Sequence, residues 1–204
     1  MGRFWMKCSI LFAVVFMLET VTSASNLKWV RASYGHVPEY AVAGGEDFQG
    51  EVLYVARIGL RSGLTPGKMA PSSRLAHASW GGKEHYKSDY EILTNPGWRS
   101  HLEWKKSSGK TPPANAVVGG SDKGRPLYVS RFLYPDGHMI PGKAAYFFAY
   151  AYIGYGGKEY FEKEWWVLVE HTSSGRKREM SSRFEYPELP DVEPLKRAPI
   201  LDDQ

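Results

Sequence analysis

Two acid–amine pairs recur at the same spacing and are the strongest candidates for chemistry in this sequence. Asp47 precedes Lys68 by about 21 positions, Asp122 precedes Lys143 by the same interval, and about 75 positions separate the two copies. A carboxylate accepts hydrogen bonds from two hydroxyl groups and an ammonium donates to a third, so each pair suits a polyol such as a sugar. Exposed tyrosine or tryptophan rings nearby would contact the apolar face of the sugar.

A simpler explanation of the pairs stays open. Asp47 can cap its own turn by accepting backbone N–H bonds, and Lys68 can be a solvated charge at a strand edge. Against it, both copies keep the acid and the amine while their neighbours change; Phe48, for example, corresponds to Lys123. This retention favours a shared binding role.

Other chemistries fit the sequence less well. Calcium would need more carboxylates than Glu46 and Asp47, and Lys68 would repel the cation, so we predict no metal site and no cofactor. The six histidines are not shared between the copies, and no phosphate loop or Gly-x-Ser-x-Gly motif occurs. A glycosidase pair made of Asp47 and Asp122 is disfavoured because the two acids lie on symmetry-related turns. We therefore predict a protein that is not an enzyme.

The repeated arginines have a structural interpretation. Arg57 and Arg131 follow Leu-Tyr-Val in both copies. We interpret them as members of structural ion pairs, with Glu84 and Glu159 as the suggested partners.

The elements that must position the acid–amine pairs are strands in a tandem repeat. Alternating or aromatic-rich segments predict strands at 50–58, 127–134, 144–153 and 164–170. Predicted turns lie at the Gly-Gly-x-Asp segments, at both Pro-Gly dipeptides, and at the later Gly-Gly pairs, which suit primed hairpin turns. We expect an all-β fold of two tandem antiparallel β repeats, about four strands each, packed through their aromatic faces with pseudo-twofold symmetry.

Composition sets the domain plan. The chain has 204 residues, 43% of them hydrophobic and 14% aromatic, with a net charge of +4. Residues 1–24 are typical of a signal peptide, and their apolar stretch is far shorter than the ~20 residues of a membrane span. We expect the two repeats at residues 25–98 and 99–170, followed by a charged, flexible C-terminal tail at 171–204. Interspersed charges argue against a nucleic-acid partner, and we predict secretion to the extracellular space.

The ordered motifs Ala-Val-x-Gly-Gly-x-Asp, Leu-Tyr-Val-x-Arg, Pro-Gly-Lys and Gly-Gly-Lys-Glu, present twice, resemble the DM-nine repeat family. The resemblance covers Trp29 to about Val169. It implies an all-β pseudo-twofold unit, homodimers, and mannose-recognising lectins of invertebrate innate immunity. It also implies that Asp47, Lys68, Asp122 and Lys143 are ligand contacts.

We therefore expect a secreted lectin for mannose-type glycans with two quasi-equivalent sites. The second copy is one residue shorter between Asp122 and Gly124, so its site is expected to be reshaped or weaker. The alternative is a non-catalytic protein-interaction or structural module with no sugar site.

Overall fold

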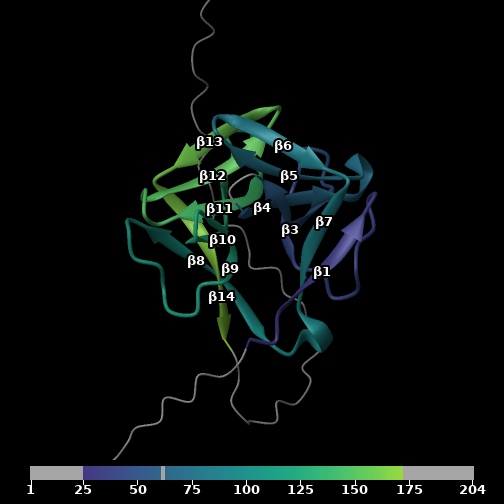
Figure 1. Cartoon of the computed structure of the whole chain (residues 1–204), viewed down its shortest axis with the longest axis horizontal. Helices are drawn as coiled ribbons and strands as arrows, with labels where there is room; N and C mark the ends of the chain where they lie inside the picture. Colours follow the sequence, from purple (N-terminus) through teal and green to yellow (C-terminus); the bar gives the residue numbers. More distant parts are fainter. Residues whose placement is uncertain (1–24, 61–62, 172–204) are drawn as a thin grey trace, which may run out of the picture. The chain divides into compact units, whose positions relative to one another are not determined.

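Antiparallel strands make up most of the structure, a computed structural model that describes residues 25–60 and 63–171 (Figure 1). The first repeat contributes β1 (Lys28–Ser33), β2 (Ala43–Glu46), β3 (Val52–Leu60), β4 (Gly63–Ala70), β5 (Leu75–Trp80), β6 (Lys83–Lys87) and β7 (Asp89–Thr94). The second contributes β8 (His101–Ser108), β9 (Val118–Asp122), β10 (Arg125–Leu133), β11 (Met139–Ala145), β12 (Tyr150–Tyr155), β13 (Lys158–Glu162) and β14 (Glu164–His171). Short 3-10 turns lie at η1 (Pro71–Ser73) and η2 (Pro96–Trp98). Within the described ranges, no helix is long and apolar enough to cross a membrane.

The strand order is symmetric about its centre. The sheet runs β1-β7-β3-β4-β5-β6-β13-β12-β11-β10-β14-β8, with β2 on β3 and β9 on β10. The second half repeats the first in reverse, and the halves join where Lys83 in β6 pairs with Lys158 in β13. In Figure 1, β5 and β6 accordingly lie beside β12 and β13. The predicted all-β fold of two antiparallel repeats with pseudo-twofold symmetry is confirmed.

The prediction of about four strands per repeat is wrong, because each repeat has seven. Short strands such as β2 (AGGE) and β6 (KEHYK) contain too few apolar residues to show an alternating pattern. The predicted strand 144–153 is in fact the end of β11, a turn, and the start of β12. The predicted signal peptide, and the predicted tail from residue 172 on, lie outside the described residues.

A shared core cluster joins the two repeats. Its buried members come in equal numbers from each repeat, at corresponding positions: Val42, Val55 and Leu93, and Val117, Val129 and Leu168. Burial of each such side chain stabilises the fold by about 1.5–3 kcal/mol. Because the cluster is built from both copies, this part of the core depends on their association.

The Gly-Gly segments that precede each Asp are close-approach points between the repeats. We predicted turns there, but they lie in strands β2 and β9. A Cβ at Gly45 would lie 1.8 Å from the carbonyl oxygen of Met139 in the other repeat, and one at Gly120 would lie 1.9 Å from that of Leu64. Only glycine allows the backbones to come this close. The two repeats therefore interlock through β2 and β9.

The predicted turns at Pro66-Gly67 and Pro141-Gly142 are also wrong, because both dipeptides lie within strands β4 and β11. Pro66 lies where β4 pairs with β3 alone, since β5 joins the ladder only from Lys68 onward. The lack of an N–H group at Pro66 is therefore tolerated at this position of β4. A Cβ at Gly67 would lie 1.9 Å from the carbonyl oxygen of His77, so this glycine serves strand packing.

The Gly81-Gly82 and Gly156-Gly157 turns are confirmed. All four glycines have positive φ, from 56° to 81°, and they connect β5 to β6 and β12 to β13. Primed hairpin turns require this conformation. The backbone N–H of Glu84 donates to the Gly157 carbonyl at 3.1 Å, so the two hairpins also contact each other.

Candidate functional site

The two lysines of the predicted pairs are buried at the junction of the repeats. Lys68 in β4 is 8% exposed and Lys143 in β11 is 4% exposed. The Lys68 ammonium donates to Glu84 Oε1 at 2.8 Å and to the Gly154 carbonyl. The Lys143 ammonium donates to Glu159 Oε1 at 2.9 Å and to the Ser79 carbonyl. Each lysine thus binds a glutamate of its own repeat and a carbonyl of the other.

The partner glutamates extend the network across the junction. Glu84 Oε2 accepts the Gly157 N–H at 3.0 Å, and Glu159 Oε2 accepts the Gly82 N–H at 2.7 Å. Sequence reasoning did not assign either glutamate to a lysine. The available signal was spacing, because Glu84 follows Lys68 and Glu159 follows Lys143 at the same interval.

The suggested pairing of the repeated arginines with these glutamates is wrong. Arg57 instead pairs with Glu91 at 2.6 Å and lies 4.3 Å from the Trp29 ring centroid. Arg131 donates to a backbone carbonyl of the other repeat and lies 4.4 Å from the Trp104 ring centroid. Burial lowers the pKa of Arg131 to about 10. The predicted ion pair is therefore found for Arg57, with Glu91 as its partner, whereas Arg131 contacts a carbonyl and a ring and has no ion pair among the described residues.

Burial and ion pairing act in opposite directions on these groups. Burial lowers the pKa of Lys68, and the Glu84 carboxylate partly restores it. For Glu84, burial alone would raise the pKa, but His77, Lys68 and the Gly157 N–H together lower it to about 2. The Glu84 carboxylate is therefore ionised at neutral pH, and it holds the Lys68 amine in a fixed position.

The Asp47 carboxylate caps its own turn, as the simpler explanation expects. Its Oδ1 accepts the N–H groups of Gln49 and Glu51, both at 2.9 Å. Among the described residues, none donates a hydrogen bond to Oδ2. The Asp47 charge also contributes, after burial and Asp136, to the raised pKa of Tyr155. Asp47 thus keeps one acceptor oxygen and lies near the Tyr155 ring.

Asp122 lies in a tighter turn than Asp47. Lys123 and Gly124 form a two-residue loop with φ values of 48° and 80°. Asp122 is 5% exposed, and its Oδ2 accepts from Arg125 at 2.8 Å. Its Oδ1 is buried with no hydrogen-bond partner among the described residues. The expectation of a reshaped second turn is consistent with this geometry.

Neither Asp makes a direct bond to the Lys of its pair. No Asp–Lys pair within 4.0 Å involves these four residues in the described part of the chain. The Asp122 charge does reach Lys143: burial lowers the pKa of Lys143, while Glu159 and then Asp122 raise it. Asp47 and Lys68 share Tyr155 as a neighbour, whose ring centroid lies 5.5 Å from the ammonium.

Each site also contains a half-exposed ring from the opposite repeat. Tyr155 of the second repeat lies beside Lys68, and Trp80 of the first repeat lies 4.9 Å from the Lys143 ammonium. The two rings occupy corresponding positions in the repeats. Sequence reasoning had assigned each site to a single repeat, whereas both repeats contribute to each site. An acceptor, a donor and a ring are the groups that a sugar requires.

The two sites differ in the capacity they have left for hydrogen bonding. An ammonium has three N–H donors. Lys68 uses two of them, on Glu84 and on a carbonyl, whereas Lys143 contacts Glu159 and both oxygens of Ser79. The first site therefore keeps a donor and an acceptor, whereas in the second the lysine donors are used and the unpaired oxygen of Asp122 is buried. Within the described ranges, no group of three or more His, Cys, Asp or Glu residues is arranged to hold a metal ion.

Comparisons with known proteins agree with the repeat pattern. The model of the DM9 repeat matches residues 12–77 and 47–162. Natterin-4 of Thalassophryne nattereri is 33% identical over 147 residues, which is 72% of this chain and 35% of natterin-4. Natterin-1 of the same organism is 28% identical over 157 residues, which is 76% of this chain and 41% of natterin-1. The chain therefore spans well under half the length of these curated relatives.

A solved structure shares the fold. The crystal structure of the nematode sperm cell motility protein MFP2B superposes with a TM-score of 0.55 at 20% sequence identity. The match covers 74% of this chain and 47% of that protein. At this level of identity the similarity concerns the arrangement of strands alone.

Proposed function

This chain belongs to the DM9 repeat family, and from that premise we propose that it is a secreted, non-catalytic lectin for mannose-type glycans. One observation carries the proposal. Each copy of the duplicated motif combines a carboxylate with a buried ion-paired lysine, and a half-exposed ring from the other repeat lies beside each lysine. Hydroxyl-rich ligands with an apolar ring face match this set of groups.

The first site is the stronger of the two under this proposal. Asp47 Oδ2 accepts a sugar hydroxyl, the remaining N–H of Lys68 donates to another, and Tyr155 contacts the ring face. The ion pair with Glu84 holds the ammonium in place before the ligand arrives, which reduces the entropy cost of binding. Two sites on one chain, or four in the homodimer that the family resemblance implies, raise avidity on a surface covered with glycans.

The test is glycan binding by the protein lacking residues 1–24, measured by calorimetry and on a glycan array. Asp47→Asn keeps the Oδ1 acceptor that caps the turn but replaces Oδ2 by a donor. Loss of a charged hydrogen bond of about 1.5–3 kcal/mol weakens mannose binding at the first site roughly tenfold or more. The matched control is Asp89→Asn, an exposed acid whose side chain accepts a hydrogen bond from Ser88. Equal affinities for the two variants would contradict the assignment.

A second candidate function has its own supporting observation. The lysines are buried and bound to glutamates, so they also explain the association of the repeats without any ligand. In that case the protein is a structural or protein-interaction module. A glycan array on which the wild-type protein binds no saccharide would favour this alternative. Sedimentation of the same sample tests the homodimer.

A further inference from the structure

A row of side chains crosses three strands from the second site. Lys143 in β11 pairs with Tyr152 in β12, and Tyr152 pairs with Phe161 in β13. Directly paired residues share one face of a sheet. The Lys143 ammonium lies 5.1 Å from the Tyr152 ring centroid, and the Phe161 side chain is 61% exposed. The second site is therefore continuous with an exposed ring on the same face.

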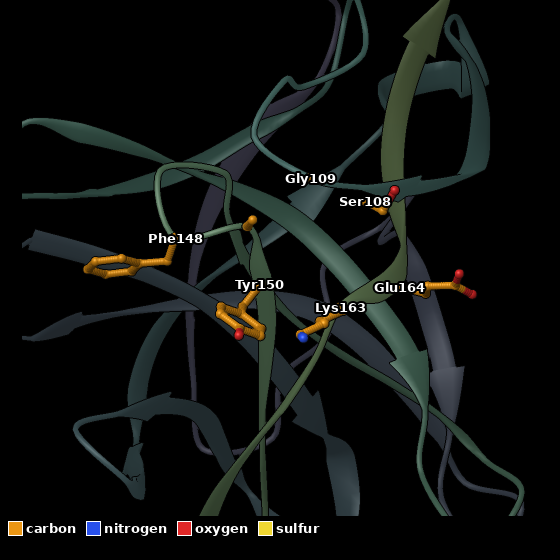
Figure 2. Close-up of a pocket in the computed structure, with 7 residues that line it drawn as sticks. Ser108, Gly109, Phe148, Tyr150, Lys163 and Glu164 are labelled. Atoms are coloured by element: carbon orange, nitrogen blue, oxygen red, sulfur yellow. The ribbon is translucent and has the colours of Figure 1, made fainter.

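Further rings adjoin this row. Tyr150 lies 5.4 Å from Phe161 and 6.3 Å from Tyr152, measured between ring centroids. Tyr150 and the 53% exposed Phe148 line a hollow of about 330 Å³, together with Ser108 and Lys163. Figure 2 shows the Lys163 side chain directed toward the Tyr150 ring.

A second connection reaches the same hollow from Asp122. The guanidinium of Arg125 pairs with Asp122 and lies 4.0 Å from the Phe147 ring centroid and 5.4 Å from that of Phe148. We call the rings of Phe147, Phe148, Tyr150, Tyr152 and Phe161 the aromatic track. It is linked to the Asp122–Lys143 site at both the acid and the amine.

The first repeat lacks most of this track. Its equivalent row is Lys68, His77 and Tyr86, in the same register. The positions that correspond to Tyr150 and Phe148 are Leu75 and Ser73. The repeats thus differ on this face, where the first repeat has a ring at Tyr86 but none at Ser73 or Leu75.

We propose that the second site binds a linear oligosaccharide, with one sugar on the exposed Arg125 beside Asp122 and the following sugars along the aromatic track to the hollow at Tyr150 and Lys163. This rests on the proposed function and assigns different ligand lengths to the two sites. The ammonium of Lys143 is fully occupied by protein acceptors, so the second site needs affinity from another source. Rings interspersed with the donors of Arg125, Lys163 and Ser108 supply it, because sugars present both apolar faces and hydroxyls.

The test isolates the second site in the Asp47→Asn background, with mannose and a linear mannotriose as probes in calorimetry. The trisaccharide should bind about tenfold more tightly than mannose. Adding Phe161→Ser or Phe148→Ser should lower trisaccharide affinity by about three- to tenfold and leave mannose affinity unchanged. The matched control is Tyr86→Ser, an exposed ring at the position in the first repeat that corresponds to Phe161.

The outcomes separate the two proposals. If neither probe binds to the wild type or to the background variant, the proposed function fails. If both probes bind equally, or the track variants behave as Tyr86→Ser, the track is no subsite although the protein binds sugar. Changed sedimentation mass or reduced vesicle binding in the track variants, with trisaccharide affinity unchanged, would assign the surface to self-association or lipid and overturn the inference.

Discussion

Replacing Lys143 with methionine should destabilise the protein far more than the same change at Lys106. Both lysines pair with a glutamate at 2.9 Å, but their surroundings differ. The side chains of Lys143 and Glu159 are 5% and 11% exposed, whereas those of Lys106 and Glu164 are 62% and 69% exposed. Removing one partner of a buried pair costs about 3–5 kcal/mol, because the remaining charge is uncompensated. An exposed pair contributes about 0–1 kcal/mol.

The assay is urea unfolding, with thermal unfolding as a second measurement. For a chain of this size, each kcal/mol lost from the free energy of unfolding lowers Tm by about 2–4 °C, so Lys143→Met should lower Tm by roughly 10 °C. The double variant Lys143→Met, Glu159→Leu should recover part of this loss, since it leaves no unpaired charge. If Lys143→Met unfolds at the same urea concentration as Lys106→Met, the buried network does not stabilise the junction.

Three further predictions concern pH, packing and ring contacts. The folded-state pKa of Glu84 is about 2 against 4.5 ordinarily, so about 3 kcal/mol of stability present above pH 4.5 should be lost as the pH falls toward 2. Glu84→Gln should flatten this part of the stability–pH profile measured by urea unfolding. Gly45→Ala should lower the free energy of unfolding by at least about 3 kcal/mol, because the added Cβ would meet a strand backbone. Gly59→Ala, where the added Cβ has open space around it, should lower it by less than about 1 kcal/mol. The Tm values of the two variants test this difference. A hydrogen bond with Tyr160, followed by burial and nearby charges, raises the pKa of Tyr134 to about 12, so Tyr160→Phe should lower the pKa of Tyr134 toward 10, measured by NMR titration of its ring signals.

The duplication could be read from the sequence, and with it the symmetric all-β fold. Identical motifs at one period must occupy equivalent places, so the pseudo-twofold symmetry of the two halves followed. The Gly81-Gly82 turn was also predictable, because its conformation depends on local sequence alone.

The misplaced turns have a tertiary cause. Pro66-Gly67 has the composition of a turn, but Gly67 is needed because the β5 backbone passes directly over it. The lysine–glutamate partners were missed for a similar reason. Lys68 and Glu84 are separated by a hairpin, and only the sheet register shows that they meet. The contribution of Tyr155 to the Lys68 site depends on contacts between the repeats, which no single-repeat pattern contains.

The close approach of Gly45 to the Met139 backbone, mirrored by Gly120 and Leu64, has a consequence for the history of the chain. The contact that the first repeat makes through Gly45 is the same as the contact that the second repeat makes through Gly120. An ancestor holding a single copy would have satisfied them only by associating with an identical molecule. The present chain is thus equivalent to such a pair joined end to end, and only one of its halves carries the aromatic track.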